Sequence, residues 1–258
     1  SRSTRKYFPH IDNVKVITSP LSVTEAKKLH NSEDDVIAVG GGAVIDAAKI
    51  ISKNPITCYP TTAAGTVHTK HSVVWDGRNK ISITVPVPDK VIIEEEFLTS
   101  LPLSVVEKTT YDAVSHCLDS LWSVKKTDLS TEFAEKSLSI LLNCDNNVDL
   151  ITAGNLAGRA IAITPTTILH SLSYPLTGIH GIDHGVALGF LLETVCEIMG
   201  SEAASHLAIP KLSVEDFDIN EAAKEALKYN KLQDTDKAFS LEDVKSIYKE
   251  SINKNKKK

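Results

Sequence analysis

The sequence predicts an α/β unit followed by an all-helical unit, and the character of the chain changes near residues 98–101. In the first third, short β-branched and apolar runs alternate with helical patterns, which is typical of an open parallel sheet with covering helices. Beyond residue 100 the strand patterns end and apolar residues recur at helical spacing. We therefore expect two domains, at residues 1–99 and 100–258.

The expected strands are short runs rich in Val, Ile and Thr that end at turn-forming residues. They lie at residues 14–18, 35–39 and 56–59, and as the two arms of a hairpin around Asp76 and Gly77 at residues 72–75 and 81–87. The run at 35–39 is continuously apolar, as expected for a parallel strand covered on both faces. Pro86 and Pro88 limit regular structure after the hairpin.

The expected helices place apolar residues on one stripe. They lie at residues 22–30, 43–52, 104–123, 130–142, 149–163, 168–174, 185–199, 219–229 and 240–252. Two of them begin with a capping pattern, Ser22 with Glu25 and Ser240 with Asp243, in which each side chain can bond the other's backbone N–H.

The composition is that of a soluble globular protein, with 42% hydrophobic and 24% charged residues among 258. A net charge of −5 argues against nucleic acid as a partner. The longest apolar stretch, residues 186–199, contains Glu193 and Glu197, so we expect a buried helix and no membrane span. The cysteines form no CxxC pair, and we expect reduced thiols in a cytoplasmic protein at Cys58, Cys117, Cys144 and Cys196.

Four residues in two stretches of the sequence suggest a metal site. Asp112 and His116 lie four residues apart, which puts both side chains on one face of a helix. His170 and His184 follow, fourteen residues apart. Three imidazoles and one carboxylate suit Fe(II) or Zn(II). The alternative is chance, because the chain has nine histidines and an Asp–His pair at this spacing is common on helix surfaces.

A second candidate site is the turn at Gly40, Gly41 and Gly42, where a predicted strand runs into a predicted helix. Glycines let the backbone approach phosphate oxygens, and the N–H groups at the helix start favour negative charge. The pattern is not the GxGxxG fingerprint, and a glycine-rich turn without a ligand remains the alternative.

Five segments, taken in order, resemble the iron-containing (group III) alcohol dehydrogenases. They are DVIAVGGGAVIDAAKII, YPTTAAGT, PDKVIIEEEFLTSLP, YDAVSHCLDS and LHSLSYPLTGIHGIDHGVALGFLL, and they lie within residues 35–192. The resemblance implies an α/β dinucleotide-binding domain and an all-helical C-terminal domain, an architecture shared with dehydroquinate synthase. It also implies a metal ion and a nicotinamide in the cleft between them, and a metal-dependent NAD(P)-linked alcohol dehydrogenase or aldehyde reductase.

The resemblance assigns a role to each matching residue. It implies that the metal ligands for Fe(II) or Zn(II) are Asp112, His116, His170 and His184. It implies that the residues contacting NAD(H) or NADP(H) are Gly40, Gly41, Gly42, Asp46, Thr61 and Thr62. Lys49 completes the same glycine-rich pattern, but a helix-face charge at Asp46 and a solvated lysine at 49 are the alternatives.

The chain also departs from the family pattern. Tyr174 stands where the family has a histidine, so Tyr174 or His180 would take over a proton-transfer role, unless Tyr174 only packs in the core. Asp119 replaces a glutamate of the family. The loop after Thr62 carries three residues that we interpret as a cationic patch for a carboxylate, phosphate or phosphonate, or else as a solvated loop: His68, Lys70 and His71.

Only 39 residues precede Gly40, fewer than the family has, so we expect either a compact variant or a chain that lacks part of the ancestral fold. In both cases the adenosine end of the cofactor pocket would be incomplete. A dehydroquinate synthase-like or glycerol-1-phosphate dehydrogenase-like enzyme is an alternative. Another is a shortened pseudoenzyme that acts as a binding module. The expected partners are a small alcohol or aldehyde and further copies of the chain, since a homodimer or larger homo-oligomer would protect an exposed sheet edge.

Overall fold

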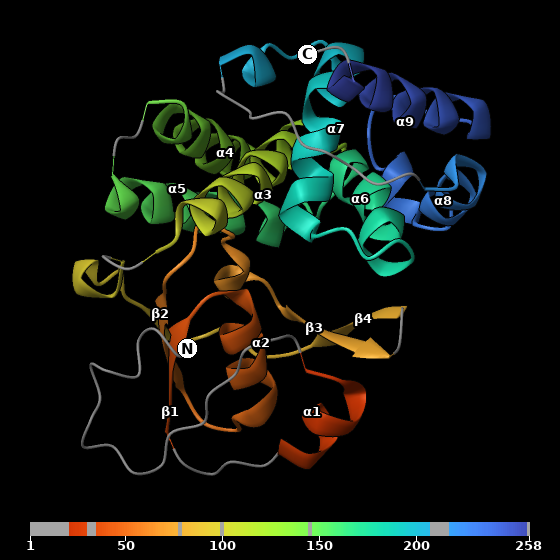
Figure 1. Cartoon of the computed structure of the whole chain (residues 1–258). Coiled ribbons are helices and arrows are strands. Elements are labelled where there is room, and N and C mark those ends of the chain that lie inside the picture. Colours follow the sequence, from red (N-terminus) through yellow and green to blue (C-terminus); the bar gives the residue numbers. More distant parts are fainter. Residues whose placement is uncertain are drawn as a thin grey trace.

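The computed structural model describes residues 21–29, 35–76, 79–98, 101–143, 146–206 and 217–256. The α/β elements gather at one end of the molecule and the long helices at the other (Figure 1). The strand expected at residues 14–18, and Cys144, lie outside the described residues. Cys58, Cys117 and Cys196 are buried free thiols, as expected.

The α/β unit is built on a parallel three-stranded sheet in the order β1-β2-β5. Its elements are α1 (Val23–Leu29), β1 (Val36–Gly40), α2 (Gly42–Ile51), β2 (Ile56–Pro60), β5 (Lys90–Val91) and the 3₁₀ turns η2 (Thr66–His68) and η3 (Glu95–Leu98). The predicted α1, β1, α2 and β2 are confirmed, while the two-residue strand β5 was not predicted. The capping box of α1 is present, since Ser22 N–H donates to Glu25 Oε2 and Glu25 N–H donates to Ser22 Oγ.

The predicted hairpin is confirmed as the antiparallel pair β3 (His71–Asp76) and β4 (Asn79–Thr84). β4 ends at Thr84, short of the predicted end at residue 87. The reason is that Pro86 and Pro88 follow, and proline has no N–H to donate to a neighbouring strand.

The second unit is all-helical, and each of its α-helices was predicted. They are α3 (Leu103–Trp122), α4 (Asp128–Leu141), α5 (Asn147–Ile163), α6 (Ile168–Gly178), α7 (His184–Met199), α8 (Ile219–Ala226) and α9 (Leu241–Lys256), with 3₁₀ turns η4 (Ala203–His206) and η5 (Asn230–Gln233). The cap of α9 is as predicted, with Ser240 N–H donating to Asp243 Oδ2 and Asp243 N–H to Ser240 Oγ.

Three helix ends differ from the prediction by three residues or more, and one of them is that of α9, which continues to Lys256 instead of ending at residue 252. α8 ends three residues early, and the chain turns into η5 soon after. α6 continues through Pro175 to Gly178, although proline lacks the N–H for a helical bond. Leu172 and Leu176 are fully buried on either side of Pro175, so packing of this turn against the core offsets the cost of the proline.

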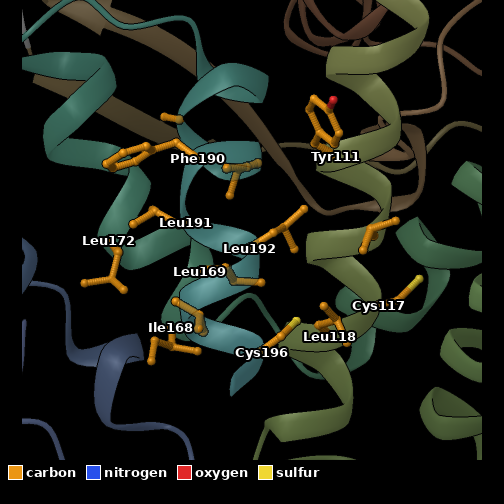
Figure 2. Packing of buried hydrophobic residues seen from close by; sticks show 14 of the residues in the cluster. Tyr111, Cys117, Leu118, Ile168, Leu169, Leu172, Phe190, Leu191, Leu192 and Cys196 are labelled. Atoms are coloured by element: carbon orange, nitrogen blue, oxygen red, sulfur yellow. The ribbon is translucent and has the colours of Figure 1, made fainter. Parts of the chain in front are cut away.

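The main core lies between α3, α6 and α7, whose apolar side chains interdigitate as Figure 2 shows. The helix expected at residues 186–199 is α7, and it is buried except on the side that carries Glu193 and Glu197. Both of these carboxylates form ion pairs with Lys254 of α9. Within the described residues, no helix combines the length and apolarity needed to cross a bilayer.

The two units meet where the loop after β2 packs on α5. A Cβ atom at Gly154 would lie 1.9 Å from the carbonyl oxygen of Ala63, and one at Gly158 would lie 1.8 Å from that of Gly65. Gly65 itself has a φ of +72°, a left-handed conformation that favours glycine. The GxxxG spacing on α5 thus allows backbone-to-backbone contact, and we propose that residues 1–99 and 100–258 are domains that meet here.

Candidate functional site

The candidate metal site starts on one stripe of α3. Asp112, His116 and Asp119 follow at spacings of four and three residues, so they share a helix face. All three are buried within the helical unit, with Asp119 fully inaccessible.

The other two histidines come from the starts of α6 and α7. His170 is the third residue of α6 and His184 is the first residue of α7. Gly185 brings α7 close to α3, because a Cβ atom there would lie 2.4 Å from the carbonyl oxygen of Lys108, one turn before Asp112. Asp183 secures the same junction, capping α7 and pairing with Lys108 at 3.1 Å.

The structure brings the four predicted ligands close to one atom, Asp112 Oδ1, but only Asp112, His170 and His184 offer ligand atoms that all lie within 4.8 Å of one another. The Nε2 atoms of three imidazoles lie 3.4 Å (His116), 3.2 Å (His170) and 4.0 Å (His184) from it. The rings of His116 and His170 are stacked, with centroids 4.5 Å apart. His184 is the most accessible ligand, with a side chain 33% exposed, so the cluster opens to solvent on that side.

The electrostatics of the cluster couple these groups. Burial acts to raise the pKa of Asp112, but the imidazoles of His116, His170 and His184 outweigh it and hold the pKa below its usual range. Burial acts to lower the pKa of His170, whereas its hydrogen bonds with Asp112 and Asp119 raise the pKa to about 10. The carboxylate is therefore ionised and surrounded by nitrogen donors.

Asp119 matters more than the sequence indicated. Its Oδ2 lies 2.8 Å from His170 Nδ1, so the ring is held at the nitrogen remote from Asp112. The sequence does contain a sign of this role, because Asp119 stands three residues after His116 and so lies on the same face of the helix as the two predicted ligands.

The two candidate proton-transfer residues lie in different surroundings. The Tyr174 ring is near the ligands, with its centroid 6.1 Å from that of His170 and 6.0 Å from that of His184. Its hydroxyl lies 3.4 Å from Thr166 Oγ1. The His180 ring instead contacts Phe217 at 5.6 Å.

The glycine turn lies against the loop that carries the predicted threonines. A Cβ atom at Gly41 would lie 3.0 Å from the Thr62 side chain, and one at Gly42 would lie 3.4 Å from Thr66 Oγ1. Thr61 N–H donates to the Gly40 carbonyl oxygen at 3.1 Å. Gly41 is the N-cap residue of α2 and has no side chain with which to cap the first turn of that helix.

Asp46 and Lys49 have structural partners that the sequence did not reveal. The interpretation of Lys49 as a solvated lysine is wrong, because it is 1% exposed and its Nζ donates to the carbonyl oxygens of Thr66 at 2.8 Å and Thr69 at 2.9 Å. Burial lowers the pKa of Lys49, and Asp46 acts against that shift. Asp46 is buried and its Oδ2 accepts the N–H of Val73. Both residues tie α2 to the segment that follows Thr62.

The three residues of the expected cationic patch carry less charge than expected. Burial, with the nearby Arg159, lowers the pKa of His68 to about 4, so His68 is neutral at pH 7. Its Nε2 lies 3.0 Å from Asn155 Oδ1 on α5. Burial and the charge of Lys231 also lower the pKa of His71, which leaves Lys70, exposed on the loop, as the permanent charge.

The residues present fit both groups that the resemblance implied. Three imidazole nitrogens around an ionised carboxylate are a donor set for Fe(II) or Zn(II). The turn at Gly41 and Gly42 offers backbone N–H groups at the start of a ten-residue helix, as a phosphate requires.

Comparison with known proteins agrees with this geometry. The family profile described as Fe-containing alcohol dehydrogenase family, C-terminal, matches residues 107–209, which contain all four clustered residues. An iron-containing alcohol dehydrogenase from Thermotoga maritima superposes with a TM-score of 0.80 at 25% identity, over 93% of this chain and 82% of that one. Residues 107–209 are thus similar to the C-terminal domain of the iron-containing alcohol dehydrogenases, and the chain has the fold of a solved member of that family.

Proteins that are similar to this chain in sequence have different named activities. A phosphonoacetaldehyde reductase from Streptomyces viridochromogenes is 27% identical, with 75% of this chain and 61% of the relative covered. The 1-propanol dehydrogenase PduQ from Salmonella typhimurium is 28% identical, with 62% of this chain and 50% of the relative covered. The chain thus spans about half to three-fifths of the length of these relatives.

Proposed function

We propose that the chain is a metal-dependent, NAD(P)-linked alcohol dehydrogenase or aldehyde reductase. The observation that carries this proposal is the gathering of three imidazole Nε2 atoms around Asp112 Oδ1 at 3.2–4.0 Å, in the fold of the iron-containing alcohol dehydrogenases. The glycine turn at Gly41, which lies at the start of α2, supports the proposal that the chain binds a nicotinamide nucleotide. A cytoplasmic location and assembly into homo-oligomers stay predictions from sequence.

Asp112, His116, His170 and His184 would hold Fe(II) or Zn(II). Such an ion supplies Lewis acidity, which polarises a carbonyl group in one direction of the reaction and acidifies an alcohol in the other. The protein's part is to keep Asp112 ionised, which the surrounding imidazoles favour.

The diphosphate of NAD(H) or NADP(H) would lie on the turn at Gly40, Gly41 and Gly42, beside Thr61 and Thr62. The nicotinamide supplies or accepts the hydride. Oxidation takes one hydride from the alcohol carbon and one proton from its oxygen, and reduction returns both. Asp46 and Lys49 would keep the Thr66 segment fixed beside this turn, since their hydrogen bonds join it to α2.

Tyr174 would hold the proton that is exchanged with the substrate oxygen. Its ring stacks on that of His184, and its hydroxyl is within 3.4 Å of Thr166 Oγ1. His180 would serve as a relay only if it leaves its contact with Phe217. Tyr174 is therefore the better placed of the two candidates.

We further propose that the substrate is a small aldehyde bearing a phosphonate, phosphate or carboxylate. The relative covering 75% of the chain is named for phosphonoacetaldehyde. Lys70 is exposed on the loop beside His71, and the charge of Lys231 from the helical unit also acts on His71. His68 and His71 would then contact the anion as neutral side chains, with the positive charge supplied by the lysines.

The test is oxidation of NADH and of NADPH by the chain loaded with Fe(II) or Zn(II), using aldehydes of matched size with and without an anionic group. We expect activity that is lost in Asp112→Asn, and a KM for the anionic aldehyde that rises about tenfold in Lys70→Ala and stays unchanged in Lys53→Ala, a control at an exposed lysine of the same unit. If the loaded wild type reduces no aldehyde with either nucleotide, the proposal fails and a binding module becomes the better interpretation.

A further inference from the structure

Asp119 is a fully buried carboxylate whose two oxygens are both engaged. Oδ1 accepts hydrogen bonds from Leu169 N–H at 2.9 Å and from Thr167 Oγ1 at 3.0 Å. Oδ2 accepts from His170, through the ring Nδ1 at 2.8 Å and the backbone N–H at 3.3 Å. One side chain of α3 thus binds three residues at the start of α6, namely Thr167, Leu169 and His170.

Asp119 caps α6 from a neighbouring helix. Thr167 is the N-cap residue of α6, but its hydroxyl donates to Asp119 and makes no cap hydrogen bond of its own. The N–H groups of Leu169 and His170 lie in the first turn, where a helix offers no acceptor. The carboxylate of Asp119 supplies that acceptor, and its charge suits the positive end of the helix dipole.

The same carboxylate holds the ring of His170, which a cap alone does not require. A carboxylate accepts, so the proton of His170 that faces Asp119 sits on Nδ1. The opposite nitrogen, Nε2, is then directed at Asp112 Oδ1, 3.2 Å away. Backbone and ring of this histidine are therefore fixed by one group.

We propose that Asp119 is a positioning residue for metal binding: it sets the place and the tautomer of His170, so that Nε2 presents its lone pair to the ion. This inference rests on the proposed metal site. The stripe on α3 then has two functions, with Asp112 and His116 as ligands and Asp119 as the support of a ligand from another helix. Thr167 Oγ1 also lies 3.1 Å from the Asp119 carbonyl oxygen, and this close approach lets the short aspartate reach the first turn of α6.

The test compares Asp119→Asn with Tyr248→Phe. Tyr248 is fully buried and its hydroxyl donates to the Leu172 carbonyl oxygen of α6 at 2.7 Å, so its loss also weakens the hold on α6 but leaves the His170 ring untouched. The readouts are the Zn(II) dissociation constant, by competition with a chromophoric chelator, the visible spectrum of the Co(II) form, and the unfolding midpoint of the metal-free protein.

We expect Asp119→Asn to bind Zn(II) about 10–100-fold more weakly and to shift the Co(II) spectrum, whereas Tyr248→Phe lowers the unfolding midpoint and keeps the wild-type affinity. Equal Zn(II) affinity in Asp119→Asn and wild type would overturn the inference, as would an equal loss in both variants. A wild type that takes up no Zn(II) overturns the proposed metal site itself, and this inference with it.

A measurement on the wild type decides the question if Asp119→Asn does not fold. Nitrogen-15 NMR of the Zn(II)-loaded protein reports which ring nitrogen of His170 carries the proton. A proton on Nδ1 with a metal-bound Nε2 supports the inference, and a proton on Nε2 overturns it.

Discussion

Gly158→Ala should destabilise the protein, although a glycine-to-alanine change in the interior of an exposed helix normally stabilises that helix. Gly158 lies in α5, where the loop after β2 crosses the helix. In an exposed helix interior, alanine is favoured over glycine by about 1 kcal/mol because glycine loses more backbone freedom. The expected sign at this position is the opposite, because the new methyl group has no space.

The size of the effect follows from the contact. A Cβ atom at Gly158 would lie 1.8 Å from the Gly65 carbonyl oxygen and 2.7 Å from its carbonyl carbon, so backbone meets backbone and no side chain can rotate away. Overpacking of a tight contact typically costs about 1–3 kcal/mol. We expect the upper part of that range, about 2–3 kcal/mol, which the helix-propensity gain of about 1 kcal/mol reduces to a net loss of about 1–2 kcal/mol, with a fall in Tm of about 2–8 °C.

The assay is thermal and urea unfolding followed by circular dichroism, with nucleotide binding measured on the same samples. Gly200→Ala is the matched control: Gly200 has a φ of +71° with no atom within 4 Å of an added Cβ, so this variant carries backbone strain of about 1 kcal/mol without a clash. Gly158→Ala should also weaken NAD(P)H binding, since the displaced loop carries Thr62 beside Gly41. A Gly158→Ala protein that melts at or above the wild-type temperature would refute the packing argument.

Two further substitutions test the loop and its partners. Lys49→Met should lower the free energy of unfolding by about 1–3 kcal/mol in urea titrations, because the carbonyl groups of Thr66 and Thr69 lose their hydrogen-bond donor. The control Lys53→Met, on the exposed surface, should change it by less than about 0.5 kcal/mol. Equal stability of the two variants would contradict the buried role of Lys49. His68 has a folded pKa of about 4, below its unfolded value near 6.5, so the unfolded chain binds more protons in that window and wild-type stability falls as pH drops from 6.5 to 4. His68→Gln keeps a donor for Asn155 but does not titrate, so wild type should lose about 2–3 kcal/mol relative to it over this window, and parallel pH profiles of the two would show that His68 is not buried as a neutral ring.

Much of the fold follows from local patterns. The capping pairs at Ser22 and Ser240, and the apolar run from residue 186, each predicted an element that the structure contains. Where tertiary packing decides, local rules failed. α6 runs through Pro175 because the flanking leucines are buried, and β5 exists only because β2 offers an edge to two residues that follow Pro86 and Pro88.

The candidate site divides in the same way. Helical spacing predicted that Asp112 and His116 lie on one helix face. The order of the family-like segments predicted that His170 and His184 lie near them, and the structure places His170 beside Asp112. The roles of Asp119 and Lys49 could not be predicted, because their partners come from a helix crossing and from a loop path distant in sequence. In the sequence alone, a buried lysine that donates to carbonyl groups cannot be distinguished from a solvated lysine.

The metal content of the purified chain tests the proposed site most directly. Elemental analysis after anaerobic reconstitution with Fe(II) or Zn(II) should compare wild type, His184→Ala and His180→Ala, the last being a nearby histidine that contacts Phe217. We expect about one ion per chain in wild type and in His180→Ala, and a loss of most of it in His184→Ala. No bound ion in wild type, or full retention in His184→Ala, would contradict the assignment of these residues as a metal site.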